Sequence, residues 1–126
     1  MRMKTHLMAI ACAGLLLAAC APDAWRPSPD YNAFLTHLKS ACEGQKIGRS
    51  ATVDYLIRRS SSSAGSYFID QTSRLYFGKT KPQTWATGVS AFLDGWPEDP
   101  GIVCVQREMA RYKAAKPPSS APPKRY

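Results

Sequence analysis

The clearest pattern of hydrophobic positions predicts a helix that begins near residue 29. Its apolar residues repeat at helical spacing and form one face of an amphipathic helix: Tyr31, Phe34, Leu35, Leu38 and Cys42. Ser28 and Pro29 are typical of the N-cap and of the first helical position, and Gly44 is suited to end the helix. This apolar stripe should face the core, and Cys42 lies on it.

A second, shorter helix is expected to start at Ser50. Its apolar face is formed by Val53, Leu56 and Ile57. Asp54 precedes Arg58 by four residues, so the two side chains can pair along the helix surface. The serine-rich residues 60–65 should end this helix as a flexible loop.

Residues 66–78 fit two structures. The segments 67–69 and 75–77 are rich in strand-favouring residues and suit a hairpin, but an isolated hairpin is marginal in water. A helix with Asp70 as N-cap and Gly78 as its end would instead gather one apolar face from Phe68, Thr72, Leu75 and Tyr76. The helix is favoured, and the hairpin is kept as the alternative.

Two more helices are predicted after residue 79. Thr80 can cap the first, Gly95 and Pro97 can end it, and its apolar positions are Trp85, Val89, Phe92, Leu93 and Trp96. Asp99 and Pro100 suit the start of the last helix, whose apolar positions are Ile102, Val105, Met109 and Tyr112. A strand at residues 102–105 is the competing prediction there.

The predicted fold class is therefore mainly α: a small bundle of four to five short helices with one disulfide. The alternative is an α+β fold with a hairpin at residues 66–78. The proposed organisation is a signal peptide (1–19), a lipidated tether (20–29), a small globular domain (30–113) and a disordered tail rich in Pro and Lys (114–126).

The N-terminal residues are typical of a secretory signal. Arg2 and Lys4 form a basic start, and residues 7–17 are apolar or small throughout. This apolar run is too short to cross a bilayer, which requires about 20 residues.

The motif Leu17-Ala18-Ala19-Cys20 resembles the lipobox of bacterial lipoproteins. The resemblance implies cleavage before Cys20 and acyl chains on its thiol. By resemblance to the sorting rule of enterobacteria, Ala21 rather than Asp at the next position favours the outer membrane. The protein is expected to face the periplasm. The alternative is an ordinary cleaved signal with an incidental cysteine at position 20.

After lipidation of Cys20, two cysteines remain in the mature chain, Cys42 and Cys104. In an oxidising compartment such a pair is most simply a disulfide, and their spacing matches neither a CxxC motif nor a zinc site. Closing a loop of this length would stabilise the fold by about 4 kcal/mol in the chain-entropy model. The alternative is a free or regulatory thiol.

Few residues suggest catalysis or metal binding. His37 is the one histidine outside the predicted signal, and no Gly-x-Ser-x-Gly motif occurs. Asp54, Asp70 and Asp94 could in principle supply carboxylates for glycoside cleavage, but each has a simpler structural role. No catalytic residue, metal site or cofactor is therefore predicted.

Charge and aromatic residues indicate the kind of partner. The net charge of +8 falls to +6 without Arg2 and Lys4, so an envelope protein or an anionic polymer is expected beside the membrane, and nucleic acid is not. Two features are candidates for binding: the cluster Leu75-Tyr76-Phe77 with Trp85 and Trp96, and the tail end Lys124-Arg125-Tyr126. Core packing and a solvated tail are their simpler interpretations.

The expected function is a membrane-anchored envelope lipoprotein with a non-catalytic binding or assembly role. A periplasmic inhibitor or immunity protein is the alternative, and a cell-wall-active enzyme is the least favoured class.

Overall fold

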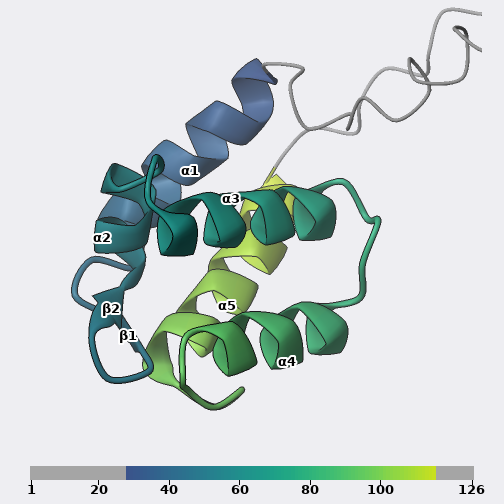
Figure 1. Cartoon of the computed structure of the whole chain (residues 1–126). Coiled ribbons are helices and arrows are strands. Elements are labelled where there is room, and N and C mark those ends of the chain that lie inside the picture. Colours follow the sequence, from purple (N-terminus) through teal and green to yellow (C-terminus); the bar gives the residue numbers. More distant parts are fainter. Residues whose placement is uncertain (1–27, 116–126) are drawn as a thin grey trace, which may run out of the picture.

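The computed structural model describes residues 28–115, which form helices and one short β-hairpin (Figure 1). In chain order the elements are α1 (Pro29–Ala41), β1 (Lys46–Ile47), β2 (Ala51–Thr52), α2 (Val53–Arg58), α3 (Ser63–Tyr76), α4 (Pro82–Phe92) and α5 (Pro100–Ala115). The mainly helical fold class is confirmed. The predicted signal peptide, Cys20 and nearly all of the tail lie outside the described residues.

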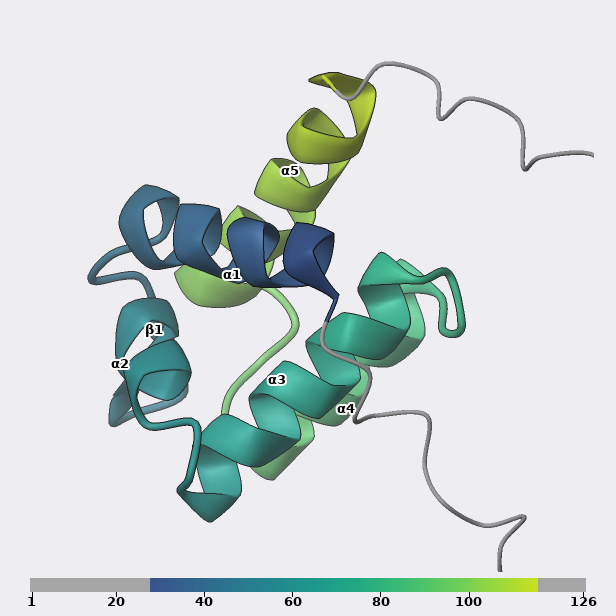
Figure 2. The ribbon, with the colours of Figure 1, turned by 90° about the horizontal axis from the view of Figure 1, so that it is seen from above.

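The helix α5 packs against α1, β1 and α4, and α3 packs between α2 and α4. In Figure 1, α3 and α4 lie side by side and α5 runs behind them. The view from above shows α1 crossing α5, with the short α2 beside the hairpin (Figure 2). Within residues 28–115, no helix is both long and apolar enough to cross a bilayer.

The start of α1 confirms the predicted cap. The Ser28 hydroxyl accepts a hydrogen bond from the Tyr31 N–H at 3.2 Å, and Pro29 opens the helix. Gly44 adopts a left-handed backbone conformation (φ 72°) just after the helix ends. The predicted stripe faces inward, since Tyr31, Phe34, Leu38 and Cys42 are buried and Leu35 is partly buried against them.

Residues 46–52 form an antiparallel hairpin that the hydrophobic pattern did not predict. Lys46 pairs with Thr52 and Ile47 with Ala51, and Gly48 takes a positive φ of 69° in the turn. The predicted helix start at Ser50 is therefore wrong. The chain stays extended through Thr52 because Ile47 is fully buried, which holds this segment against the core.

The helix α2 begins at Val53. The Thr52 hydroxyl accepts from the Tyr55 N–H and acts as the N-cap. Asp54 forms the expected ion pair with Arg58, at 3.1 Å, and also accepts a hydrogen bond from the Gly44 N–H at 2.9 Å. Asp54 thus joins α2 to the end of α1.

Residues 66–78 are helical, so the hairpin alternative is wrong. The predicted face is buried, with Phe68, Thr72, Leu75 and Tyr76 in the core, and Gly78 has a positive φ after the helix.

The start of α3 differs from the prediction. Ser62 is the N-cap and accepts from the Gly65 N–H at 3.0 Å, so residues 63–65 belong to the helix and not to a loop. Asp70 is not a cap: it lies inside the helix and pairs with Arg74 at 3.3 Å. The early start follows from Gly65, because any Cβ there would collide with the Arg59 carbonyl.

The limits of α4 also required correction. Thr80 does not cap the helix: Lys81 occupies the N-cap position without a side-chain bond, and Pro82 follows. The helix ends at Phe92, before the predicted stop at Gly95 and Pro97, and Asp94 takes a left-handed conformation (φ 55°) after it. The predicted apolar stripe therefore stops before it can include Trp96.

Residues 102–105 are helical, so the competing strand is wrong. Asp99 precedes α5 as expected, and its carbonyl accepts from the Val103 N–H. Its carboxylate, however, accepts from the N–H groups of Gly48 and Trp96, which lie outside this helix.

The core brings Cys42 and Cys104 together in a disulfide, as predicted. Their Cα atoms lie 5.9 Å apart, and both side chains are buried. The link joins the end of α1 to the first turns of α5. Trp85 lies near the centre of the same core, and its indole N–H donates to the Thr72 hydroxyl at 3.3 Å.

Reduction of this disulfide should lower the melting temperature markedly. A closed loop of this length contributes about 4 kcal/mol, and each kcal/mol shifts the melting temperature by ~4–8 °C in a domain this small. Thermal melts with and without reductant measure the effect. A Cys42→Ala, Cys104→Ala double variant is the control, since reductant should not change its melting. Equal melting of the natural protein under both conditions would show that the bond does not form.

Asp54→Asn should destabilise the fold by about 1–2 kcal/mol at pH 7. The Gly44 N–H donating to Asp54, helped by the Thr52 hydroxyl and the Arg58 charge, holds the pKa of this carboxyl below its usual range and outweighs the effect of burial. Because the pKa of the Asp54 carboxyl is lower in the folded state than in the unfolded state, its ionised form stabilises the fold above about pH 4. This stabilisation is lost as the pH falls through the folded-state pKa. Chemical denaturation at pH 7 and pH 3 should therefore show the two proteins converging in acid.

The matched control is Asp94→Asn, because Asp94 is exposed and the structure gives its side chain no hydrogen bond or ion pair among residues 28–115. Its unfolding free energy should equal that of the natural protein at pH 7. If Asp54→Asn lowers the free energy of unfolding by the same amount at pH 3 as at pH 7, the electrostatic explanation is refuted.

Candidate functional site

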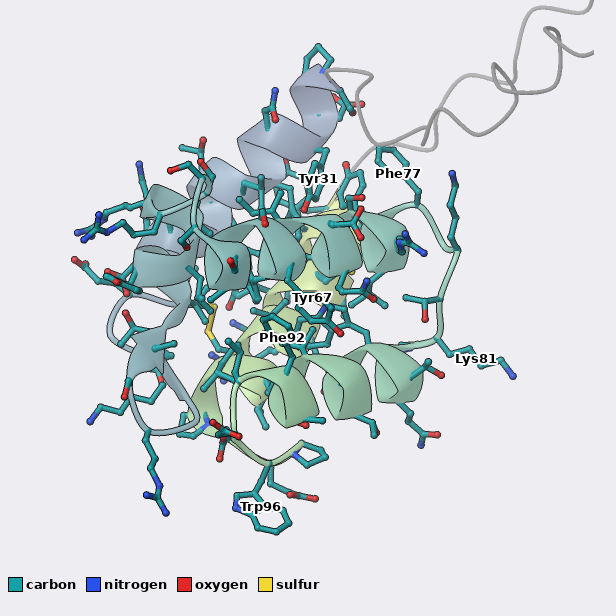
Figure 3. The ribbon with its side chains drawn as sticks, in the orientation of Figure 1. Tyr31, Tyr67, Phe77, Lys81, Phe92 and Trp96 are labelled. Atoms are coloured by element: carbon teal, nitrogen blue, oxygen red, sulfur yellow. A yellow bond between two sulfur atoms is a disulfide. The ribbon has the colours of Figure 1, made fainter. Side chains whose placement is uncertain are left out.

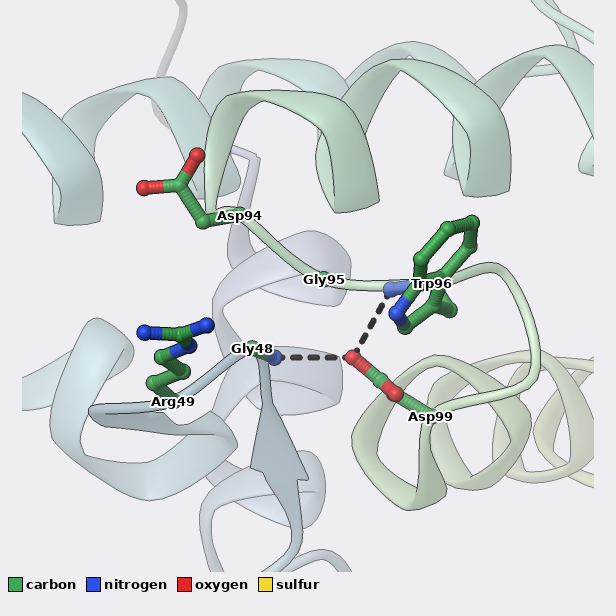
Figure 4. Close-up of a pocket in the computed structure, with 6 residues that line it drawn as sticks. All are labelled: Gly48, Arg49, Asp94, Gly95, Trp96 and Asp99. Atoms are coloured by element: carbon green, nitrogen blue, oxygen red, sulfur yellow. Dashed lines mark hydrogen bonds between the residues drawn. The ribbon is translucent and has the colours of Figure 1, made fainter.

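A shallow pocket of about 530 Å³ lies between two loops that are distant in the sequence (Figure 4). One is the turn between β1 and β2, and the other connects α4 to α5. The lining residues are Gly48, Arg49, Asp94, Gly95, Trp96 and Asp99. Because it gathers charged, aromatic and backbone groups from two loops, we take this pocket as the candidate site.

Asp99 holds the two loops together. Its Oδ2 atom accepts from the Gly48 N–H at 2.8 Å and from the Trp96 N–H at 3.0 Å, as the dashed lines in Figure 4 show. Hydrogen bonds to a charged acceptor are stronger than those between neutral groups. One carboxylate oxygen therefore fixes the backbone on both sides of the pocket.

The two loops meet backbone to backbone, and this contact requires glycine. A Cβ on Gly48 would collide with the Leu93 carbonyl oxygen, and one on Gly95 would collide with the Asp99 carboxylate and the Gly48 nitrogen. Gly48 also has a positive φ, which side chains disfavour. The pocket floor is thus made of tightly packed backbone.

The rim of the pocket carries three exposed side chains of different chemistry. Arg49 and Trp96 stand on opposite sides of the junction between Gly48 and Asp99 (Figure 4). The Trp96 ring is the most exposed large hydrophobic side chain in the described chain, at 73%. Among residues 28–115, the structure gives neither Arg49 nor Asp94 a side-chain hydrogen bond or ion pair.

This pocket suits binding of a ligand that combines an apolar face with polar groups. An indole ring offers a flat apolar surface, a guanidinium offers donors, and carboxylates offer acceptors. One cation and two carboxylates, Asp94 and Asp99, give the lining a formal charge of −1. No nucleophile held by a base occurs among these six residues.

His37 lies away from this pocket and connects two helices. Its Nε2 atom is 2.9 Å from Glu108 Oε2, which joins α1 to α5. Arg107 and Arg111 also lie near Glu108, at 3.6 Å and 3.5 Å. The hydrogen bond from His37, with the Arg111 charge, lowers the pKa of Glu108 against the effect of burial. The histidine therefore has a structural partner.

The predicted aromatic cluster is divided between core and surface. Leu75, Tyr76 and Trp85 are buried, which confirms the core interpretation for these three. Phe77 and Trp96 are exposed, at 51% and 73%, and lie at opposite ends of the domain in Figure 3. They do not form one surface.

A second, half-buried aromatic feature was not predicted. Tyr67 of α3 and Phe92 of α4 stack face to face with ring centroids 3.9 Å apart, as the labelled side chains in Figure 3 show. The Tyr67 hydroxyl donates to the Gly88 carbonyl at 3.3 Å. This pair closes the outer side of the contact between α3 and α4.

The structure places some predicted residues and leaves others untested. Cys20 and the tail end at residues 124–126 lie outside the described residues. Over residues 28–115, His, Cys, Asp and Glu side chains nowhere gather in threes as a metal site would require. The sequence pattern did not indicate that Arg49, Asp99 and the two glycines of the pocket belong to one site. The one sequence feature that pointed to this region was the concentration of turn-forming residues at 94–101.

Comparison with models of known protein families, with curated proteins and with solved structures found no significant match.

Proposed function

We propose that the protein is a lipid-anchored envelope lipoprotein with a non-catalytic binding or assembly role, held at the outer membrane and facing the periplasm. The observation that carries the proposal is the buried disulfide between Cys42 and Cys104. Disulfides form and persist in oxidising compartments such as the periplasm. The bond thus supports export independently of the N-terminal motif.

The proposed anchor is supported by the resemblance of Leu17-Ala18-Ala19-Cys20 to a lipobox. Each buried methylene of an acyl chain contributes ~0.8 kcal/mol, so two or more chains on Cys20 hold a protein on a membrane stably. Only eight residues separate Cys20 from Pro29, where α1 begins. At no more than ~3.6 Å per residue, this spacer keeps the domain within about 30 Å of its anchor.

The binding role is supported by the surface of the domain. Trp96 and Phe77 expose large aromatic rings, and aromatic residues are enriched at binding surfaces. The pocket beside Trp96 offers donors, acceptors and an apolar face on a fixed backbone. His37 lies outside this pocket, where its Nε2 atom pairs with Glu108.

If Cys20 is lipidated, the Cys20→Ser variant should not incorporate labelled palmitate and should not be found in the membrane fraction. The thiol is the atom that receives the lipid, and a hydroxyl does not replace it. Metabolic labelling and fractionation of cells measure both properties. Cys12→Ser is the matched control and should retain both. A Cys20→Ser protein that still carries palmitate and sediments with membranes would exclude this site of lipidation.

The binding role predicts discrete cross-linked products in the cell. A photo-reactive amino acid at position 96 should trap a defined partner, whereas the same group at the exposed position 40 on α1 should not. Gel shifts and mass spectrometry identify the products. Absence of products from position 96 and from position 77 would contradict a binding role for these surfaces.

A further inference from the structure

We infer that the pocket between the β1–β2 turn and the α4–α5 loop binds a neutral sugar ring of an envelope glycan. Trp96 would stack on the ring, and Arg49 and Asp99 would bind its hydroxyl groups. The inference deepens the proposed function, which supplies the place where the protein meets glycans. The recognition itself depends only on the pocket.

Trp96 is positioned for stacking. The residue is 73% exposed, while its backbone N–H is held by Asp99 at 3.0 Å. The base of the side chain is therefore fixed although the ring remains open to solvent. One face of a sugar ring is formed by C–H groups, and such a face packs on an indole as other apolar surfaces do. Little ordering entropy is lost when a platform is fixed in advance.

The polar groups of the pocket match sugar hydroxyls. Asp99 uses its Oδ2 atom for the Gly48 and Trp96 N–H groups, and no described donor contacts its Oδ1 atom. That oxygen can accept from a ligand hydroxyl. Arg49 carries up to five N–H donors and has no partner among the described residues. A hydroxyl both donates and accepts, so one sugar ring satisfies both residues.

The charge of the lining decides between a neutral and an anionic ligand. Arg49 contributes one positive charge, and Asp94 and Asp99 contribute two negative charges. The net negative lining repels a polyanion, although the chain as a whole is basic. The anionic polymer expected from the composition is therefore not the ligand of this pocket.

The backbone contact keeps the pocket in its binding shape. A Cβ on Gly95 would collide with the Gly48 backbone, a Cβ on Gly48 would collide with the Leu93 carbonyl, and Asp99 bridges the same two loops. A sugar would thus enter a site that is already formed. Pre-formed pockets with a few placed polar groups are typical of small-ligand sites.

Titration of the purified protein with the trisaccharide of N-acetylglucosamine tests the inference by NMR. The Trp96 indole signal and the Gly48 and Gly95 amide signals should shift together, with a Kd in the millimolar range, on the order of 1 mM. Trp96→Ala should weaken binding about tenfold or more, and Arg49→Ala several-fold. Both side chains are exposed, so both variants should melt like the natural protein.

Phe77→Ala is the matched control, because it removes another exposed aromatic ring far from the pocket, and it should bind as the natural protein does. A sulfated heparin tetrasaccharide should leave the pocket signals unchanged. The inference is overturned by unchanged pocket signals at saturating sugar, or by equal binding to Trp96→Ala. It is also overturned if the Trp96 signal follows protein concentration, since self-association would then occupy this surface.

The sugar titration and the palmitate labelling test the two proposals independently of each other. The titration uses a soluble ligand and needs no membrane, so it reports on the pocket whether or not Cys20 is lipidated. Loss of lipidation would revise where the protein works without changing the titration.

Discussion

The bond between Cys42 and Cys104 is the constraint on which the arrangement of the domain depends. It fixes the end of α1 against the start of α5, and the hairpin follows Cys42 within a few residues. Gly101 then allows β1 to lie directly on α5, because a Cβ there would collide with Ile47 and with the backbone of β1. The β1–β2 turn is thereby brought to the α4–α5 loop. The pocket at their junction is a consequence of that covalent link.

Local sequence patterns predicted the helices well where packing and capping agree. Ser28 and Pro29 precede an uninterrupted apolar stripe, and α1 begins where they indicate. Asp70 and Thr80 are equally good capping residues but do not cap. Tertiary contacts decide the helix start in these cases: Gly65 lets α3 begin early, and Pro82 sets the first turn of α4. The residue type identifies candidate N-cap residues, and tertiary packing determines which of them caps the helix.

The hairpin and the pocket could not be predicted from the sequence for a related reason. Strands of two residues are too short to show alternation of polar and apolar positions. The bond from Asp99 to Gly48 joins residues 51 positions apart, and no spacing rule connects them. The disulfide was predictable because a single pair of cysteines remains once Cys12 is assigned to the proposed signal peptide and Cys20 to the proposed lipid anchor. Long-range contacts are visible in a sequence only when so few partners exist.

The separation of 62 residues between the bonded cysteines has a consequence for synthesis. In a chain exported as we propose, Cys42 reaches the periplasm long before Cys104. The bond can close only after nearly every helix has crossed the inner membrane. During that interval Cys42 is a reduced thiol on an incomplete domain, exposed to periplasmic oxidants. Under the proposed export, the bond between α1 and α5 is therefore among the last features of the described domain to form.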